Sequence, residues 1–181
     1  MARFSEFLEN ISIIKLFLPL LTLLLLTGGE VLAGPIVQGM VRAVYDGDTI
    51  LLATPQQSRL KVRLYGIDAP ETSKRDSPGQ AFGSLARRAL MSKIMGKEVS
   101  AEIIEADQYN RSVAVIRYAG RDINREMVSE GMAWAYRRYL SGPYASQYIV
   151  VEQTARVSRR GLWSASNPMP PWEFRHKNGR R

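Results

Sequence analysis

The chain has 181 residues, with 25 Lys and Arg against 17 Asp and Glu, one His, no Cys and a formal net charge of +8. The lack of Cys excludes a Cys nucleophile, a Cys-ligated zinc site, an iron–sulfur cluster and a disulfide framework. The one imidazole, His176, lies near the C-terminus among basic residues, which argues against a Ser-His-Asp triad or a two-His zinc site. An active site would therefore use carboxylates, Arg, Lys, Tyr, hydroxyl groups or a hard metal ion.

The N-terminal segment has the pattern of a targeting sequence. Residues 16–26 form an uncharged, leucine-rich run that Lys15 precedes and the small-residue stretch 31–34 follows. This pattern predicts a signal peptide at residues 1–33, cleaved after Ala33, and export of the folded part to a periplasm or the medium. An uncleaved membrane anchor is the alternative. Without this segment, which holds two basic and three acidic residues, the chain carries about nine net positive charges and attracts polyanions such as nucleic acid, anionic membrane surfaces or acidic glycans.

The first half of the remaining chain favours strands. Between residues 36 and 53, two apolar runs flank Asp46-Gly47-Asp48, which predicts a hairpin. Residues 59–65 alternate with period two, so the apolar members are expected to face one way and the basic ones the other. Residues 66–72 are predicted to form a loop, because Pro70 disfavours helical geometry in the residue before it.

The second half combines helices with another hairpin. Helical periodicity predicts a helix from about Ser77 to Met95, ended by Gly96. Alternating residues 98–104 and 111–118 predict two strands joined by a turn. Further helices are expected at about 123–130, ended by Gly131, and at about 143–158, ended by Gly161.

These elements predict one α+β domain over residues 34–166, followed by a basic and mobile tail at 167–181. Five strands with about three helices, but without regular βαβ alternation, favour a mostly antiparallel sheet. A five-stranded Greek-key β-barrel of the OB type is one compact solution.

Polar residues at three strand ends form a candidate site for phosphodiester hydrolysis. That reaction needs a hard divalent cation, a base for water and fixed positive charge on the phosphoryl oxygens. Asp48 and Asp68, with a loop carbonyl, are suitable oxygen ligands for Ca²⁺, and Glu71 can hold and deprotonate a water. Arg63 and Arg111 can each bind phosphate oxygens through a planar guanidinium. Each signal has an ordinary explanation as a turn or surface residue, and only their combination is informative.

The order and spacing of these motifs resemble the staphylococcal nuclease (thermonuclease) family. The matching segments are Asp46-Gly-Asp48-Thr, Arg63-Leu-Tyr-Gly-Ile-Asp68-Ala-Pro-Glu71-Thr, Asp107-Gln-Tyr109-Asn-Arg111 and Gly161-Leu-Trp163, within about residues 38–165. The resemblance implies an OB-fold, Ca²⁺-dependent nuclease that cleaves DNA and RNA with little sequence preference.

The resemblance also implies a role for each matching residue. Asp48, Asp68 and the backbone carbonyl of Ala69 correspond to the calcium ligands, and Asp46 to a carboxylate that acts through water. Glu71 corresponds to the general base or water-positioning residue. Arg63 and Arg111 correspond to the clamps on the phosphate and the transition state, and Tyr109 to a tyrosine of the substrate pocket.

Three positions depart from the family pattern. Ala69 replaces a hydroxyl residue, which should leave a carbonyl ligand intact. Gln108 stands where a Lys is seen and Asn110 where a Gly is seen, so phosphate contacts and turn geometry are expected to differ. All six acidic and arginine positions are retained, which argues against a non-catalytic copy.

The aromatic residues outside these motifs have two interpretations. Trp134, Trp163 and Trp172 are expected to be packing residues. For Tyr136 and Tyr139, which flank two arginines, stacking on nucleic-acid bases and packing are equally supported, and we treat Tyr136 as a candidate substrate-binding residue.

Three functions remain open on the sequence. The first is an exported, monomeric, metal-dependent nuclease. The second is a non-catalytic OB-type module that binds single-stranded nucleic acid, although carboxylates in a phosphate groove repel the ligand unless a cation bridges them. The third is a membrane-anchored adaptor, which requires the N-terminal segment to stay uncleaved.

Overall fold

The computed structural model describes residues 34–75, 77–109 and 111–179. The expected signal peptide and Asn110 lie outside these residues. The elements are β1 (Ile36–Val44), β2 (Thr49–Ala53), β3 (Arg59–Leu64), β4 (Ile67–Asp68), α2 (Gly83–Ile94), β5 (Glu98–Ala106), β6 (Ser112–Tyr118), β7 (Arg121–Asp122), α3 (Ile123–Ser129), β8 (Trp134–Ala135), α4 (Gly142–Val157) and α5 (Pro171–Lys177), with 3₁₀ turns at Arg137–Tyr139 and Gly161–Ser164.

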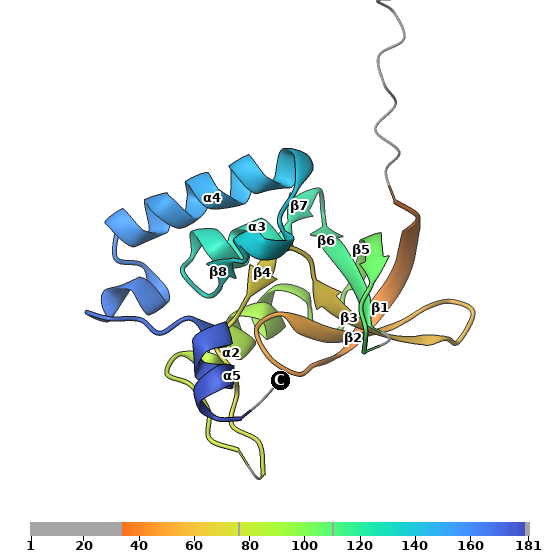
Figure 1. The fold of residues 1–181 in the computed structure, drawn as a ribbon. Coiled ribbons are helices and arrows are strands. Elements are labelled where there is room, and N and C mark those ends of the chain that lie inside the picture. The colour runs from red at the N-terminus through yellow and green to blue at the C-terminus, as the bar shows by residue number, and fades with distance from the viewer. Residues whose placement is uncertain (1–33, 76, 110, 180–181) are drawn as a thin grey trace, which may run out of the picture. The chain divides into compact units, whose positions relative to one another are not determined.

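Five of the strands form a closed barrel, shown in Figure 1. They follow the order β3-β2-β1-β5-β6 with antiparallel neighbours, and β3 closes the barrel by pairing in parallel with β6. In the closing pair, Val62 lies opposite Ser112 and Leu64 opposite Ala114. This arrangement confirms the predicted α+β class and the five-stranded Greek-key barrel of the OB type. The described residues hold four α-helices, one more than the three expected, because α5 lies in the tail.

Alternation along the strands supplies the barrel interior. In β3, Val62 and Leu64 are buried while Arg59 and Lys61 are exposed. The same period of two buries Val99 and Ala101 in β5, as the sequence predicts. Helices α3 and α4 pack against each other beside this barrel, and α3 contacts β6. The apolar core therefore continues from the barrel into the helical layer.

Helix α2 starts about six residues later than predicted. The prediction followed apolar spacing from Ser77, but Phe82 adopts a left-handed backbone conformation with φ of 67°. The next residue, Gly83, lies so close to the loop that a Cβ there would be 2.1 Å from the backbone oxygen of Glu71. The backbone N–H of Gln80 also donates to that oxygen at 2.8 Å. Residues 77–82 are therefore packed against the loop that carries Glu71 and do not form the first turns of the helix.

Two glycines, one after α3 and one after α4, allow the backbones of these helix ends to lie in contact. Gly131 and Gly161 have φ values of 69° and 51°, which explains why the sequence pattern ends a helix near each of them. A Cβ on Gly131 would lie 2.2 Å from the backbone oxygen of Arg160, and one on Gly161 would lie 2.3 Å from the oxygen of Gly131. The N–H of Leu162 donates to that same oxygen at 2.9 Å. This close backbone approach brings Trp163 into one hydrophobic cluster with Ala155 of α4.

The segment expected to be a mobile tail contains α5, and α5 packs on the domain. The ring of Trp172 makes an edge contact with Trp134 at 5.5 Å between centroids. Trp134 in turn contacts Trp163 at 4.3 Å, and both of these rings are buried. The packing role expected for the three tryptophans is confirmed. Within the described part of the chain, no helix combines the length and the apolar character that crossing a membrane requires.

We expect Asn124→Ala to lower the free energy of unfolding by about 3 kcal/mol, because it leaves buried backbone groups without partners. The fully buried Asn124 amide accepts from the N–H of Ile116 and donates to the oxygens of Tyr65 and Ala114, at 3.0 Å in each case. Urea denaturation measures the loss. Gln153→Ala is the matched control, because this amide is exposed on α4. Equal stability of the two variants would contradict the proposed role of Asn124.

Candidate nucleic-acid cleavage site

One guanidinium joins two buried carboxylates at the centre of the site. Asp48 lies directly before β2, Arg63 lies on β3 and Asp68 lies on β4. Arg63 Nη1 donates to Asp48 Oδ1 at 3.0 Å, and Arg63 Nη2 donates to Asp68 Oδ1 at 2.8 Å. Both carboxylates are almost completely buried, whereas the Arg63 side chain is 17% exposed. The structure therefore brings three of the predicted site residues into direct contact.

Small residues allow these segments to approach one another. A Cβ on Gly47 would lie 2.7 Å from the Cβ atoms of both Ala69 and Ala86, so only glycine fits this turn without displacing the loop and α2. The backbone N–H of Ala69 donates to Asp48 Oδ2 at 2.9 Å. The turn before β2 is thereby fixed against the loop after β4. Ala69, predicted to offer its carbonyl to a cation, lies next to both carboxylates.

The environment separates the pKa values of the two turn carboxyls. Burial raises the pKa of Asp46 to about 8, and the neighbouring charge of Asp48 adds to this shift. Burial acts in the same direction on Asp48, but the Arg63 guanidinium and the Ala69 N–H outweigh it and lower the pKa of Asp48. The pKa of Asp48 therefore lies below its ordinary value and that of Asp46 lies above it. The side chain of Asp46 also accepts from the N–H of Asp48, at 3.4 Å.

Glu71 reaches the same centre through an arginine that sequence reasoning missed. Arg175 of α5 donates from Nη1 to Glu71 Oε1 at 2.9 Å and to Asp68 Oδ1 at 3.0 Å. Its Nη2 donates to Asp68 Oδ2 at 2.7 Å. Arg175 lies in the segment that composition indicates to be a mobile tail, so its sequence position gave no sign of this role. The Trp172-x-x-Arg175 spacing, which places an aromatic and a cationic side chain on one helical face, is the one available signal.

Arg111 lies at the same end of the barrel but has a different partner. Val113 of β6 is the register partner of Arg63, and Arg111 lies two residues before it, directly ahead of the first residue of β6. Its Nε donates to Asp107 Oδ2 at 2.6 Å, and its guanidinium lies over the ring of Tyr109. The same Asp107 accepts from the N–H groups of Tyr109 and Arg111 through Oδ1. Asp107, which begins one of the matching motifs but had no predicted role of its own, thus shapes the turn and binds Arg111.

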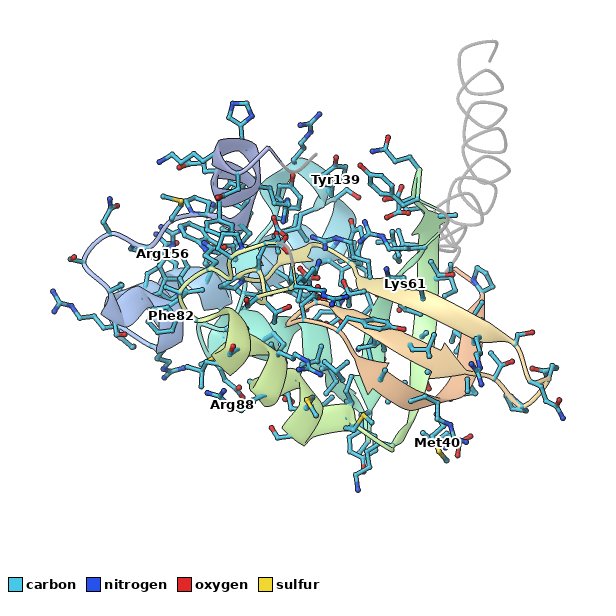
Figure 2. The ribbon with its side chains drawn as sticks, turned by 90° about the horizontal axis from the view of Figure 1, so that it is seen from below. Met40, Lys61, Phe82, Arg88, Tyr139 and Arg156 are labelled. Carbon is cyan, nitrogen blue, oxygen red and sulfur yellow. The ribbon has the colours of Figure 1, made fainter. Side chains whose placement is uncertain are left out.

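The two candidate substrate tyrosines differ in their surroundings. Tyr109 is 58% exposed at the tip of the turn between β5 and β6. Tyr136 is half-buried and stacks on Trp172 with centroids 5.2 Å apart and an interplanar angle of 4°. Tyr139 is half-exposed and makes an edge contact with Tyr136. It lies on the same side of the molecule as α5, and Met40 lies on the opposite side (Figure 2).

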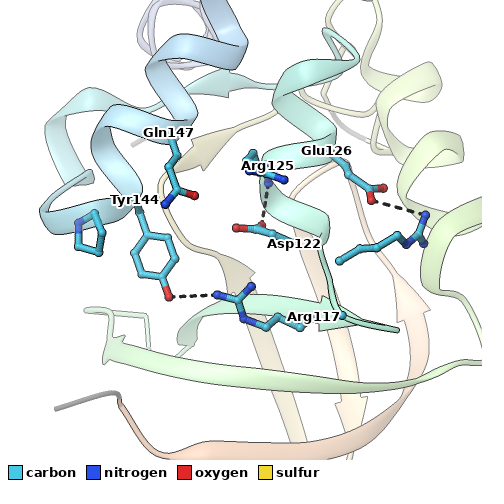
Figure 3. A pocket seen from close by; sticks show the side chains of 9 residues that line it. Arg117, Asp122, Arg125, Glu126, Tyr144 and Gln147 are labelled. Atoms are coloured by element: carbon cyan, nitrogen blue, oxygen red, sulfur yellow. Dashed lines mark hydrogen bonds and ion pairs between the residues drawn. The ribbon is translucent and has the colours of Figure 1, made fainter. Parts of the chain in front are cut away.

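A separate polar hollow lies at the other end of β6. It is lined by residues of the β6–β7 turn, α3 and the start of α4, including Arg117, Asp122, Arg125 and Tyr144 (Figure 3). Arg117 donates to the Tyr144 hydroxyl at 3.5 Å, and the carboxylate of Asp122 accepts from the N–H of Arg125 at 2.9 Å. None of the predicted site residues lines this hollow, and β6 separates it from Arg111.

Comparison with known proteins agrees with this architecture. The family model for staphylococcal nuclease homologues matches residues 61–165. The chain belongs to the staphylococcal nuclease family. Membership confirms the resemblance drawn from the motifs, and it classes the chain with nucleases. The matched segment runs from β3 to the residues just after the 3₁₀ turn at Gly161–Ser164, and so includes Arg63, Asp68, Glu71 and Arg111.

Individual relatives support the family membership. A micrococcal nuclease of Shigella flexneri is 42% identical over 147 residues, which cover 76% of this chain and 80% of the relative. An uncharacterized endonuclease of Haemophilus influenzae is 37% identical over 134 residues, covering 74% of this chain and 70% of the relative. An uncharacterized endonuclease of Escherichia coli O157:H7 is 35% identical over 143 residues, covering 78% and 86%.

We expect Asp107→Asn to lower stability at neutral pH, and the difference from the parent chain to shrink in acid. Burial opposes the shift, but the contacts with Arg111 lower the pKa of Asp107 below its ordinary 3.8. A carboxyl with a lowered folded-state pKa stabilises the fold above its unfolded pKa and loses this contribution as the pH falls through the folded pKa. The two urea midpoints should therefore converge below pH 3.8. Glu105→Gln, at an exposed position on β5, is the control; a gap that stays constant with pH would contradict the assignment.

Proposed function

We propose that the chain is a calcium-dependent nuclease that hydrolyses phosphodiester bonds of DNA and RNA with low sequence specificity. The observation that carries the proposal is the shared contact of Arg63 with the buried carboxylates of Asp48 and Asp68. Burying two carboxylates is unfavourable unless positive charge compensates them. A hydrolase that acts on a phosphodiester uses such an arrangement to hold a hard cation and to present a guanidinium to phosphate oxygens.

The donor set fits Ca²⁺. Asp48 and Asp68 supply carboxylate oxygens and Ala69 supplies a backbone carbonyl, which are the hard ligands that Ca²⁺ prefers. Among the residues that the structure describes, no three His, Cys, Asp or Glu side chains are grouped as a metal cluster. We therefore propose a site with only two direct carboxylates, which relies on water and substrate phosphate for its remaining ligands. Bound there, the cation would supply Lewis-acid polarisation of the phosphoryl group.

The chain's own residues then take distinct roles. Arg63, already at the carboxylates, binds a phosphate oxygen with the N–H groups that its bonds to Asp48, Asp68 and the backbone oxygen of Ile67 leave. Arg111, directly before the neighbouring strand β6, stabilises the charge that develops on the phosphoryl oxygens. Glu71 positions the attacking water and accepts its proton. Asp46 is proposed to act on the cation through a water, and the exposed Tyr109 and half-buried Tyr136 to contact the nucleic acid.

We expect Glu71→Gln to lower kcat by about 100- to 10,000-fold, because the amide cannot accept the proton of water. The measurement is cleavage of unstructured single-stranded DNA with Ca²⁺ present, together with circular dichroism to verify folding. Glu98→Gln is the matched control, because it removes an exposed carboxylate on β5. A similar loss for Arg63→Ala and Arg111→Ala, but not for the exposed Arg125→Ala, would extend the assignment to the clamps. An unchanged rate in Glu71→Gln would remove Glu71 from the reaction.

We expect cleavage to require Ca²⁺ and to be at least about tenfold slower with Mg²⁺. Mg²⁺ demands tighter octahedral geometry and releases its waters reluctantly, whereas this site offers few protein ligands. The measurement compares initial rates with each cation after treatment with a chelator. Equal rates would contradict the calcium assignment. Tight binding of single-stranded DNA without cleavage under any cation would instead indicate the non-catalytic binding module.

We also propose that residues 1–33 direct export and are removed. The nine net positive charges of the remaining chain suit an exported protein that meets nucleic acid outside the cytoplasm. N-terminal sequencing of the protein from the producing cells tests this proposal. A first residue of Gly34 supports it, and an intact N-terminus in the membrane fraction supports the anchor.

A further inference from the structure

The C-terminal helix α5 lies directly on the proposed cation site. Arg175 donates from both terminal nitrogens to the carboxylate of Asp68, and from Nη1 also to Glu71. The Arg175 side chain is 23% exposed, so the contact is largely shielded from solvent. Together with the bond from Arg63, these contacts engage both oxygens of Asp68. A proposed cation ligand and the proposed general base are thus held by one guanidinium.

Aromatic packing fixes α5 in this position. The ring of Trp172 is stacked parallel to Tyr136 and makes an edge contact with Trp134. Just before the helix, the backbone oxygen of Met169 accepts a hydrogen bond from the Gln80 side chain. Residues 80 and 71 are themselves joined by a backbone hydrogen bond. The segment before α5 is therefore attached to the loop that carries Glu71.

These contacts and a bound substrate use the same atoms. A cation on Asp68 needs oxygen lone pairs that Arg175 occupies, and a dication beside two guanidinium groups is repelled by both. A nucleic-acid base that stacks on Tyr136 needs a ring face, and Trp172 covers one. Helix α5 thus places a cation where the metal would bind and an aromatic ring where a base would stack.

We propose that α5 is an autoinhibitory segment of this chain: Arg175 and Trp172 occupy the cation and base positions until Ca²⁺ and nucleic acid together displace them. The proposal rests on the proposed function, because it takes Asp68 as a cation ligand and Tyr136 as a substrate contact. Its physical basis is competition. The apparent affinity for Ca²⁺ equals the intrinsic affinity of the site multiplied by the fraction of molecules in which α5 is displaced.

The experiment is a calorimetric titration of the full chain with Ca²⁺, without nucleic acid. We expect Arg175→Ala to bind Ca²⁺ about tenfold more tightly than the parent chain, which corresponds to α5 being displaced in about a tenth of the parent molecules. Lys177→Ala is the matched control: it removes the same charge from the same helix at an exposed position. Arg175→Gln, which keeps the first carbons of the side chain but removes its charge, serves as a second variant and should show the same gain.

Hydrogen exchange gives a second readout that does not depend on cleavage. In the parent chain, adding Ca²⁺ and single-stranded DNA should raise exchange in residues 171–177 while the barrel strands stay protected. In Arg175→Ala, exchange in these residues should be high before any addition.

Each outcome decides the proposal. Unchanged or weaker Ca²⁺ binding in both Arg175 variants would overturn it, and so would unchanged exchange in α5 on ligand addition. A loss of cleavage by Arg175→Ala at saturating Ca²⁺ would also overturn it, because Arg175 would then act in the reaction. If the parent chain cleaves DNA with Ca²⁺, any of these three results would reject the proposed autoinhibition but leave the proposed nuclease activity intact. If neither the parent nor the variants bind Ca²⁺, the proposed cation site fails and the autoinhibition fails with it.

Discussion

The compensation of two buried carboxylates by Arg63 is the interaction on which the site depends. Asp48 and Asp68 belong to different strand ends, and both are withdrawn from water. In such an environment an unpaired charge is strongly unfavourable, so the turn before β2, strand β3 and strand β4 must stay together. The same requirement leaves the centre sensitive to additional positive charge. The compensation of the two negative charges changes when a cation binds, when a guanidinium from α5 approaches or when Arg63 binds phosphate.

The sequence predicted the barrel and most of the centre, because both depend on local signals. Strict alternation in residues 59–65 marks β3, and the Asp-Gly pair marks the turn before β2. Asp48, Arg63 and Asp68 follow in order along the chain, and the closed barrel brings them into contact. Their roles in binding a cation or phosphate remain predictions.

What the sequence could not predict depends on contacts between distant segments. The start of α2 is set by the approach of Gly83 to the backbone of Glu71, which apolar spacing does not reveal. The pairing of Arg111 with Asp107 depends on the turn between β5 and β6. Composition assigned residues 167–181 to a mobile tail, because proline and basic residues are frequent there, yet the rings of Trp134 and Tyr136 provide a surface for α5.

The parallel pairing of β3 with β6, which closes the barrel, joins positions 62 and 112, which lie far apart in the chain. Closing so long a loop is entropically unfavourable, so contacts of this kind tend to form late in folding. Arg63 lies on one strand of this pair, and Arg111 directly precedes the other. A chain whose hairpins and helices have formed, but whose barrel is still open, therefore has its two arginines apart. The site therefore exists only when the barrel is closed. A partly folded chain that has its secondary structure but an open barrel is expected to lack activity.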